Sequence, residues 1–414
     1  MEVERNFGLA DRESSYYQYL PFSVPEGWRS VAVELSYDRT SAVIDLGLFG
    51  PGGFRGWSGG ERSFVHVAEA WATPGYLPGR LAGEWSVVLG LYQLPEQGVR
   101  VTVSAGPGPA EPPPAKAWPP VPSEAPVHAR PSARPGHLWV AGDFHCHSEH
   151  SDGALSLAEL AALARQRGLD FLAVTDHNTV SHFPHLEAAG LRYGVTLLAG
   201  QEVTTPEGHA NCIGKVQWAD FRTSPDEWMA KARSEGGLSS LNHAVLGTLS
   251  WRMPLSRPPD LMELWHASWD RASGDVFQFW ASLGFPVPVG GSDFHRPGDV
   301  DATGSALWPG APTTWVEVEG DGRDGPPSPV SIIEGLRAGS VAISCSPAGP
   351  LAVRRGDEVE VTGGAGATVV VLEGPLQPLG EGRRLAVREE RASLPVGAGT
   401  ALLVREGKVV ALCP

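Results

Sequence analysis

Histidines and carboxylates gather in a few short segments of this sequence. The segment "DFHCHSEHSDG" (143–153) alone holds three of the chain's 13 histidines. Imidazoles and carboxylates without thiolates are typical ligands of catalytic zinc, manganese or iron, whereas structural zinc sites favour cysteine. The sequence therefore predicts a catalytic metal centre. Its candidate ligands are His145, His147, Asp152, His177, Glu202, His209, His243, Asp293 and His295.

The number of candidate ligands indicates more than one ion. Nine side chains exceed the needs of a single ion, so two or three ions bridged by a carboxylate are expected. Such ions lower the pKa of a bridging water from about 15.7 towards about 7, which makes hydroxide available as a nucleophile at neutral pH. They also polarise a phosphoryl or acyl oxygen and stabilise the charge that develops on it. The predicted chemistry is metal-dependent hydrolysis.

Each of these motifs also has an ordinary structural explanation. A lone buried histidine is more often a hydrogen-bonded core residue than a ligand, and "SDG" (151–153) is a common turn. The motifs, however, follow successive predicted strands, and the carboxyl ends of parallel strands lie on one face of a sheet. Six motifs placed in this way favour a shared site. The later five are "VTDHN" (174–178), "GQEV" (200–203), "EGHANCIG" (207–214), "LNHA" (241–244) and "GGSDFH" (290–295).

The elements that must position these residues begin near His137, where strands and helices start to alternate. The segment 156–168 predicts a helix, because Ser156 and Glu159 can form a capping box and Gly168 follows the last turn. About seven alternating strands imply a parallel sheet, open or closed into a barrel. The strands are predicted at 138–145, 170–176, 195–203, 238–243, 261–266, 286–292 and 313–319, and further helices at 180–194, 224–237, 270–284 and 328–339.

Regions rich in β-structure flank this α/β domain, which occupies 137–345. Residues 1–105 predict an N-terminal β-sandwich or jelly roll, because short runs rich in Val, Leu and aromatic residues are bounded by Gly and Pro. Residues 106–136 are so dense in proline that they predict an extended linker. Residues 346–414 return to short apolar runs and predict a small C-terminal β-sandwich.

Charge and cysteine content exclude several classes of protein. The formal net charge is −15 at pH 7, which disfavours a broad basic surface for nucleic acid. The four cysteines form no CxxC pair, so neither a zinc knuckle nor a redox dithiol is indicated. The amino-terminal segment lacks the apolar stretch of a signal peptide, and no apolar run is long enough to span a membrane. A cytoplasmic protein with a small-molecule substrate is expected.

The motifs, in this order, resemble those of the PHP (polymerase and histidinol phosphatase) superfamily. The segment "EGHANCIG" and the preceding β-rich region resemble its CehA/McbA-type metallohydrolase branch. The resemblance is strong over about 137–345, and it implies a distorted (β/α)7 barrel with a trinuclear metal site. By this resemblance, the first ion is held by His145, His147, Glu202 and Asp293, the second by Glu202, His209 and His243, and the third by Asp152, His177 and His295.

Further residues are candidates for supporting parts in catalysis. Asp176 directly precedes a candidate ligand and is expected to orient an imidazole. His182 is either a proton donor to the leaving group or an ordinary surface histidine. Candidate substrate contacts are Asn178, Arg252 and Arg296. The histidines expected to be solvated are His150 and His185.

Three functions remain open from the sequence. The leading hypothesis is a phosphoesterase acting on a small phosphorylated molecule such as a nucleotide. The second is a hydrolase of carboxylic or carbamate esters that uses the same ions. A phosphate requires cations in the pocket and Arg252 would suit one, so this residue favours the first hypothesis. The third hypothesis is a non-catalytic module in which the β-domains bind a glycan or another protein.

Overall fold

The computed structural model describes residues 1–268, 274–301, 304–320, 325–374 and 377–413. These residues form two compact units. Unit 1 consists of Met1–Ala117, Glu149–Gly153 and Asp176–Pro184, and unit 2 of Trp118–Ser148, Ala154–Thr175 and His185–Pro414. Two short segments of the expected α/β domain thus group with the N-terminal region, which differs from the linear boundaries expected from the sequence.

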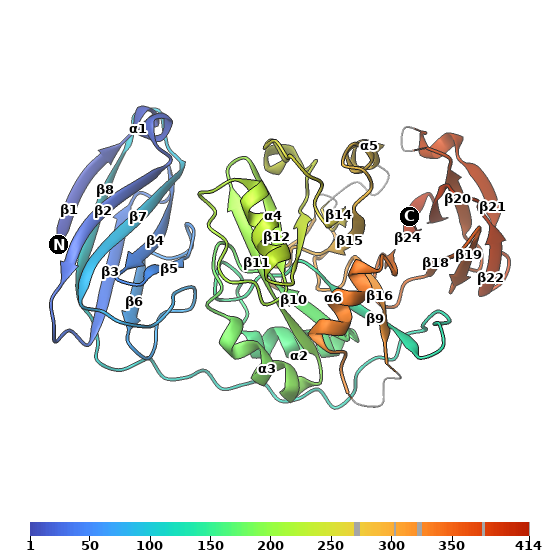
Figure 1. Cartoon of the computed structure of the whole chain (residues 1–414), viewed down its shortest axis with the longest axis horizontal. Helices are drawn as coiled ribbons and strands as arrows, with labels where there is room; N and C mark the ends of the chain where they lie inside the picture. The colour runs from blue at the N-terminus through green and yellow to red at the C-terminus, as the bar shows by residue number, and fades with distance from the viewer. Residues whose placement is uncertain (269–273, 302–303, 321–324, 375–376, 414) are drawn as a thin grey trace. The chain divides into compact units, whose positions relative to one another are not determined.

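Unit 1 contains two antiparallel sheets that enclose one hydrophobic core. The core draws on both sheets, with Val33 and Val103 from one and Leu46 and Leu89 from the other. This is the arrangement of a β-sandwich, and its strands are the blue ribbons of Figure 1. One sheet has the order β1 (Glu2–Phe7), β8 (Val99–Pro107), β3 (Ser30–Tyr37) and β6 (Phe64–Ala68), the other β2 (Tyr17–Val24), β7 (Gly83–Gln93), β4 (Val43–Gly50) and β5 (Gly53–Trp57); a short helix, α1, spans Leu9–Ser14.

A carboxylate, Asp45 of β4, lies buried in this sandwich. Its Oδ2 accepts a hydrogen bond from the hydroxyl of Tyr16 at 3.3 Å. A Cβ atom on the neighbouring Gly90 would lie 2.6 Å from the same oxygen, so glycine makes room for the carboxylate. Burial raises the pKa of Asp45 to about 7, although the Tyr16 hydrogen bond and the charge of His177 act in the opposite direction.

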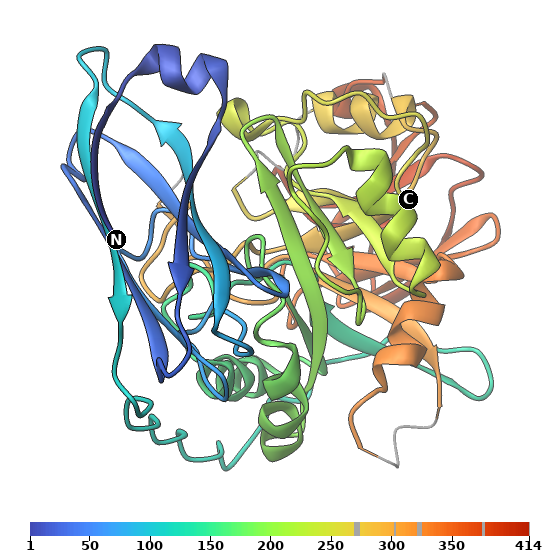
Figure 2. The same ribbon diagram turned by 60° about the vertical axis from the view of Figure 1, so that its left-hand side comes forward.

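Unit 2 is built on a large mixed sheet rather than a purely parallel one. Strands β9, β10 and β11 are parallel to one another, and so are β13, β14 and β15, but β12 is antiparallel to both of its neighbours. The reason is local: β11 and β12 are joined by a tight hairpin at Thr205 and Gly208, and a hairpin can only join antiparallel strands. Figure 2 shows this long hairpin in yellow-green.

The strands of unit 2 follow the order β15-β14-β13-β12-β11-β10-β9-β16-β17-β24-β23-β20-β21, with a second sheet of β18-β19-β22. Their bounds are β9 His137–Asp143, β10 Phe171–Val174, β11 Thr196–Thr205, β12 Gly208–Ile213, β13 Leu238–Leu241, β14 Leu261–His266, β15 Val287–Gly291, β16 Thr313–Glu319, β17 Val341–Ser344, β18 Leu351–Arg355, β19 Glu358–Thr362, β20 Thr368–Leu372, β21 Arg383–Ala386, β22 Arg391–Pro395, β23 Thr400–Arg405 and β24 Lys408–Cys413.

The segments that directly follow β9 and β15 are hydrogen-bonded to each other. The amide of Asp293 donates to the carbonyl of His145 at 2.9 Å, and the amide of His147 donates to the carbonyl of Phe294 at 3.0 Å. Cys146, between the two histidines, is fully buried and forms a parallel bridge with Phe294. These bonds bring the two outer members of the β9–β15 series together at the level of the candidate ligands. The seven-stranded barrel expected from the resemblance stays a prediction.

The helices begin and end largely where the sequence predicts. In α2 (Leu157–Arg167) the Ser156–Glu159 capping box is present and Gly168 adopts the left-handed conformation. The expected helix over 180–194 is shorter, because a proline disfavours helix at the residue before it and Pro184 follows Phe183. The expected helix over 270–284 is described only from 274, and residues 270–273 lie outside the described residues. The remaining helices are α3 (Leu186–Tyr193), α4 (Pro225–Ser234), α5 (Gly274–Ser282) and α6 (Pro329–Arg337), with 3-10 turns η1 (Phe183–His185), η2 (Gly247–Leu249) and η3 (Leu379–Glu381).

The C-terminal strands have their own core but continue the large sheet. Residues from β19, β20 and β23, among them Val361, Val369 and Leu403, pack together. Strand β24 pairs with β17 at Ile343 and Leu412, so this region is hydrogen-bonded to the α/β part of unit 2.

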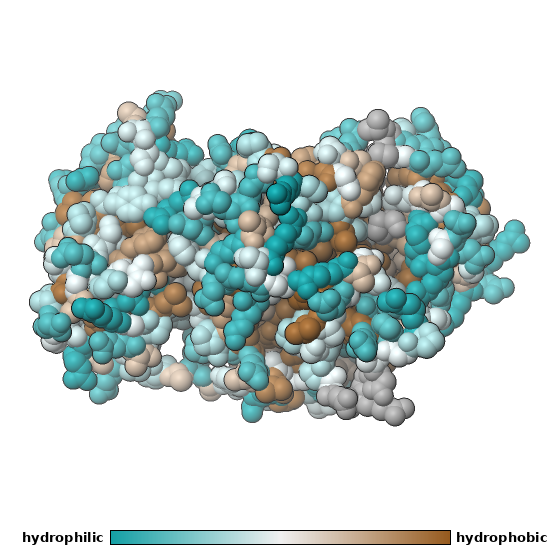
Figure 3. All heavy atoms as spheres, in the orientation of Figure 1, coloured by the Kyte–Doolittle hydropathy of each residue, from teal (hydrophilic) through white to brown (hydrophobic). Residues whose placement is uncertain are grey.

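None of the described helices is long and apolar enough to cross a membrane. On the face seen in Figure 3, hydrophilic side chains predominate and hydrophobic ones form small groups.

We expect Asp45→Asn to remove a pH-dependent loss of stability. The pKa of Asp45 is about 7 in the folded chain and 3.8 ordinarily. A raised carboxyl pKa contributes stability that is present below about pH 4 and is lost as the pH rises through about 7. The comparison uses metal-free protein. Between about pH 4 and pH 8, the free energy of unfolding of the native chain should fall by up to about 4 kcal/mol more than that of the variant.

Urea denaturation over this pH range measures the difference. Glu34→Gln, at an exposed position of β3, is the control and should leave the pH dependence unchanged. Parallel curves for Asp45→Asn and the native chain would contradict the raised pKa.

Candidate metal centre

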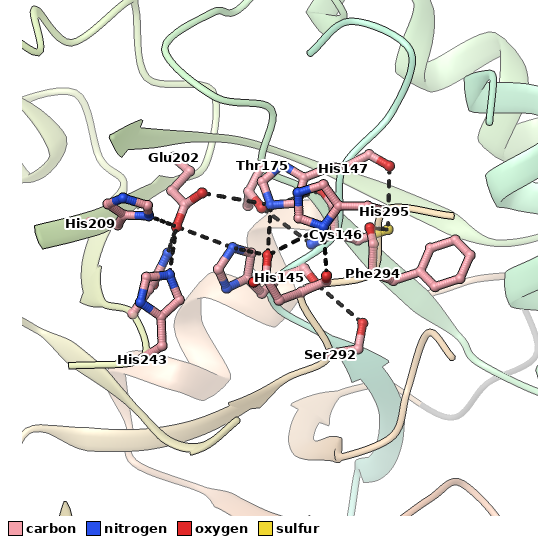
Figure 4. A network of polar contacts seen from close by, with 12 residues as sticks. His145, Cys146, His147, Thr175, Glu202, His209, His243, Ser292, Phe294 and His295 are labelled. Atoms are coloured by element: carbon pink, nitrogen blue, oxygen red, sulfur yellow. Dashed lines mark hydrogen bonds and ion pairs between the residues drawn. The ribbon is translucent and has the colours of Figure 1, made fainter. Parts of the chain in front are cut away.

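The centre of the site is Glu202, a fully buried carboxylate on β11 that faces four imidazoles. Its Oε1 lies 3.2 Å from Nε2 of His145, 3.3 Å from Nδ1 of His209 and 3.4 Å from Nε2 of His243. Its Oε2 lies 3.6 Å from Nε2 of His147. Figure 4 shows His209 and His243 on one side of Glu202 and His145 on the other. A carboxylate placed between two groups of imidazoles fits a ligand that bridges two ions.

The β11–β12 hairpin brings Glu202 and His209 to the same face. In its register Glu202 pairs with Asn211, and Thr204 pairs with His209. Glu202 and His209 are therefore diagonal neighbours, whose side chains lie on one face of the antiparallel pair and reach each other. His243 follows the adjacent strand β13, which pairs with β12. The expected second-ion ligands, Glu202, His209 and His243, have ligand atoms within 4.8 Å of one another.

A second carboxylate, Asp293, completes the expected first-ion set. Its Oδ1 lies 3.0 Å from Nε2 of His147 and 3.1 Å from Nε2 of His145. The same oxygen lies 3.8 Å from Nδ1 of His295, whose ring stacks on that of His147 at a centroid distance of 4.2 Å. The structure thus brings the side chains of His145, His147, Glu202 and Asp293 close together, and their assignment to a first ion stays a prediction.

Two residues of this cluster are absent from the sequence prediction, Glu263 and His266 of β14. Glu263 accepts a hydrogen bond from Nδ1 of His145 at 3.1 Å and another from the amide of His243 at 2.6 Å. Nδ1 of His266 accepts from the amide of Ser268 at 3.1 Å, so its proton resides on Nε2, 3.4 Å from Asp293. Both residues therefore orient candidate ligands.

The signal for these two residues was present but ambiguous. "LMELWH" (261–266) places a carboxylate and an imidazole in an otherwise apolar, fully buried strand. Residues three apart in a regular strand face opposite sides of the sheet. A register shift between Glu263 and Trp265 changes the alternation, so Glu263 and His266 share a face.

The hydrogen bonds of His145 fit a metal ion. Glu263 is a carboxylate that only accepts, so Nδ1 of His145 carries a proton, and in the neutral ring Nε2 then presents its lone pair. That Nε2 atom is buried, forms no hydrogen bond of acceptable geometry, and faces the oxygens of Glu202 and Asp293. A lone pair aimed at two carboxylates is repulsive unless a cation lies among them. A carboxylate that orients an imidazole towards a metal is a common arrangement in metalloproteins.

The electrostatics of the cluster lead to the same conclusion. Burial alone would lower the pKa of His145, but the charges of Asp293, Glu202 and Glu263 raise it well above its ordinary value. Burial alone would raise the pKa of Asp293, but His145 and His295 lower it well below its ordinary value. The cluster therefore attracts positive charge, which either protons or metal ions can supply.

The backbone is strained at several site residues. Five described residues other than glycine have positive φ, and two of them, His243 at 29° and Asp293 at 52°, are candidate ligands. A third, Asn178 at 55°, directly follows His177, and asparagine tolerates this region better than most residues. Strain of this kind persists only where the surrounding structure imposes it, and it concentrates at functional sites.

The remaining candidate ligands fall into both units. Asp152 and His177 belong to unit 1, where Oδ1 of Asp152 lies 3.6 Å from Nε2 of His177. His295 belongs to unit 2, and the third-ion assignment stays a prediction.

Asp176 contacts the imidazole of His182, with Oδ2 of Asp176 3.2 Å from Nδ1 of His182. His182 is fully buried, so the alternative of a surface histidine is wrong.

The other polar candidates lie in different environments. Asn178 is buried, whereas Arg252 and Arg296 are exposed. The guanidinium of Arg252 donates to a carbonyl at the tip of the β11–β12 hairpin. Their roles in substrate binding stay predictions.

The expectation that His150 is solvated is wrong, because His150 is buried and its Nδ1 forms a 2.7 Å hydrogen bond with the hydroxyl of Ser181. His185 is exposed, as expected.

Comparison with known proteins identifies a domain in this part of the chain. Residues 143–247 match the family described as "PHP domain". A 63-residue segment is 41% identical to a 5'-3' exoribonuclease of Haemophilus influenzae and covers 15% of this chain and 23% of that protein. A 66-residue segment is 39% identical to a 3',5'-nucleoside bisphosphate phosphatase of Chromobacterium violaceum and covers 16% and 23%. The match to the PHP domain thus spans residues 143–247, and the matching segments span about a quarter of the length of these two relatives.

Among solved structures, the chain is similar to a two-domain protein from Bacteroides vulgatus that contains a predicted PHP-like metal-dependent phosphoesterase. The match covers 70% of this chain and 98% of that one, with 16% identity and a TM-score of 0.42. A putative metal-dependent phosphoesterase from Bifidobacterium adolescentis matches over 40% of this chain and 91% of its own, with 18% identity and a TM-score of 0.32.

We expect Glu263→Gln to weaken metal binding about 10- to 100-fold, the usual effect of losing a group that orients a ligand. The amide keeps the shape of the side chain but loses the charge, and it can no longer accept from both His145 and His243. Competition against a chelating fluorescent dye measures the affinity. Glu319→Gln, exposed at the end of β16, is the control. Unchanged affinity in Glu263→Gln would show that Glu263 does not orient His145.

Proposed function

We propose that the chain is a metal-dependent phosphoesterase that acts on a small phosphorylated substrate of nucleotide type. The observation that carries the proposal is Glu202, a buried carboxylate within 3.2–3.6 Å of four imidazole nitrogens. Such a centre suits zinc, manganese or iron. When bound, the ions would activate water as the nucleophile and neutralise charge on the phosphoryl group.

We assign the ligands as the resemblance implies. The first ion is held by His145, His147, Glu202 and Asp293, and the second by Glu202, His209 and His243. The proposed third-ion ligands are Asp152, His177 and His295. The segment "EGHANCIG" (207–214) and the β-rich region that precedes the PHP domain are the reason to propose the CehA/McbA-type branch. The cytoplasmic location expected from the sequence stays a prediction.

The chain's own residues contribute orientation and charge to this chemistry. Glu263 holds His145 with Nε2 towards the carboxylates, and His266 holds Asp293. Fixing ligands in this way avoids reorganisation when the substrate binds. The full burial of His182, which contacts Asp176, favours a role in holding that carboxylate over proton donation to a leaving group.

Two features support a phosphate ester as substrate. Two or three ions in one centre present a concentrated positive charge, which stabilises the charge on a transferring phosphoryl group. Two of the proteins with matching segments are described as an exoribonuclease and a nucleoside bisphosphate phosphatase, both of which cleave phosphate esters of nucleotides.

The test combines elemental analysis with a hydrolysis panel. The native chain should bind at least two ions and cleave nitrophenyl phosphate, a nitrophenyl phosphodiester or nucleoside phosphates. Glu202→Ala should lose bound metal, and its activity should fall about 10³-fold or more, because the ions supply several kcal/mol of transition-state stabilisation. Glu207→Ala is a matched control, since Glu207 is exposed at the tip of the same hairpin.

Other outcomes would replace the proposal. Less than one ion per chain, with no change of metal content in Glu202→Ala, would contradict the metal centre. Hydrolysis of carboxylic or carbamate esters without phosphate esters would support the second hypothesis. A metal-loaded chain inert towards the whole panel would support a binding module.

A further inference from the structure

The N-terminal sandwich of unit 1 contacts two loops that carry candidate ligands. The loops are 149–153, which contains Asp152, and 176–184, which contains His177. The ring nitrogen of His177 and the carboxylate of Asp152 approach to 3.6 Å where the loops meet. The sandwich forms hydrogen bonds with residues one to four positions away from these two along the chain.

Gly75, in the turn that follows β6, bonds to the second loop through both of its main-chain groups. Its amide donates to the hydroxyl of Ser181 at 3.0 Å, and its carbonyl accepts from the hydroxyl of Thr179 at 2.9 Å. Its φ is +98°, and a Cβ atom there would lie 2.6 Å from the carbonyl oxygen of His150 in the first loop. Only glycine combines this backbone conformation with such a close approach.

Arg62, just before β6, bonds to the first loop. Its guanidinium donates to the carbonyl of Ser151 at 2.7 Å and also to that of Glu149. Lys116, at the end of the N-terminal segment of unit 1, forms an ion pair with Glu149 at 2.6 Å. The guanidinium is a planar fork, so two bonds to carbonyl groups two residues apart fix the path of the loop as well as its distance.

The two loops are also bonded to each other. The hydroxyl of Ser151 donates to Oδ1 of Asp176 at 2.6 Å, and Nδ1 of His150 hydrogen bonds with the hydroxyl of Ser181 at 2.7 Å. Ser151 directly precedes Asp152, and Asp176 directly precedes His177. The first of these bonds therefore joins the chain neighbours of the two candidate ligands.

We propose that the N-terminal sandwich is a positioning part of the metal centre, in which Arg62 and Gly75 clamp the loops that carry Asp152 and His177. This inference rests on the third-ion assignment of the proposed function. Loops tend to be mobile, and a metal ion that had to order both loops on binding would bind more weakly. The clamp orders them beforehand, as a built functional site requires.

Arg62→Ala tests the clamp with two readouts. In the metal-free chain, hydrogen exchange should accelerate at 149–153 and 176–184 and stay unchanged in the β9–β15 sheet. In a Mn²⁺ titration followed by electron paramagnetic resonance, the third equivalent should bind about tenfold more weakly, as for other residues that orient ligands, while the first two are unaffected. Arg62→Lys should restore part of the affinity, because an ammonium group can still donate to a carbonyl.

Arg39→Ala is the matched control, because Arg39 donates to the carbonyls of Gly60 and Glu61 within the sandwich and not to the loops. Thr179→Val removes one clamp bond without disturbing the arginine and should reproduce a smaller effect. Unchanged exchange in Arg62→Ala would show that the clamp does not hold the loops. Faster exchange with unchanged binding of the third ion would show that the clamp does not serve the metal centre.

The clamp and the proposed function fail in different ways. A native chain that binds metal but hydrolyses nothing would contradict the phosphoesterase proposal, and both clamp readouts would still apply. A native chain that binds only two ions would contradict the third-ion assignment and with it the metal role of the clamp.

Discussion

The need to balance buried negative charge dominates this molecule. Glu202 is fully buried, and Asp293 and Glu263 share the imidazole of His145 with it. Removing such charges from water is costly unless opposite charge and hydrogen bonds compensate. The charges of Asp293, Glu202 and Glu263 raise the pKa of His145, and the charges of His145 and His295 lower that of Asp293, so a proton on His145 supplies part of this compensation. Divalent ions, when bound, would provide the same compensation and the proposed chemistry as well.

Several irregular features of the fold serve this cluster. The β11–β12 hairpin places Glu202 and His209 on one face, and the register shift in β14 turns Glu263 and His266 to the same side. His243 and Asp293 have positive φ where their strands end. The register shift and the positive φ values depart from ideal strand geometry. Such departures cost free energy, and packing on the surrounding strands must support them.

The N-terminal sandwich belongs to the same compact unit as the loops that carry the candidate ligands Asp152 and His177. Its strands hold a buried carboxylate, Asp45, whose pKa responds to the charges of His177 and Asp152. Its turn residues bond to the loops that carry the same two residues. A β-domain that a proline-rich segment follows in the sequence thus interacts electrostatically with two candidate ligands and forms hydrogen bonds with the loops that carry them.

The sequence by itself determined the chemical class of the site and the elements beneath it. Local signals such as the Ser156–Glu159 capping box and Gly168 act between near neighbours, so they could be read directly. Imidazole and carboxylate motifs predicted the cluster around Glu202, because they follow predicted strands and the ends of parallel strands lie on one face of a sheet. The tertiary structure alone decided the antiparallel course of β12, the inward turn of Glu263 and His266, and the burial of His150. These depend on a hairpin, a register shift and contacts between segments far apart in the chain, and strand periodicity carries no information about any of them.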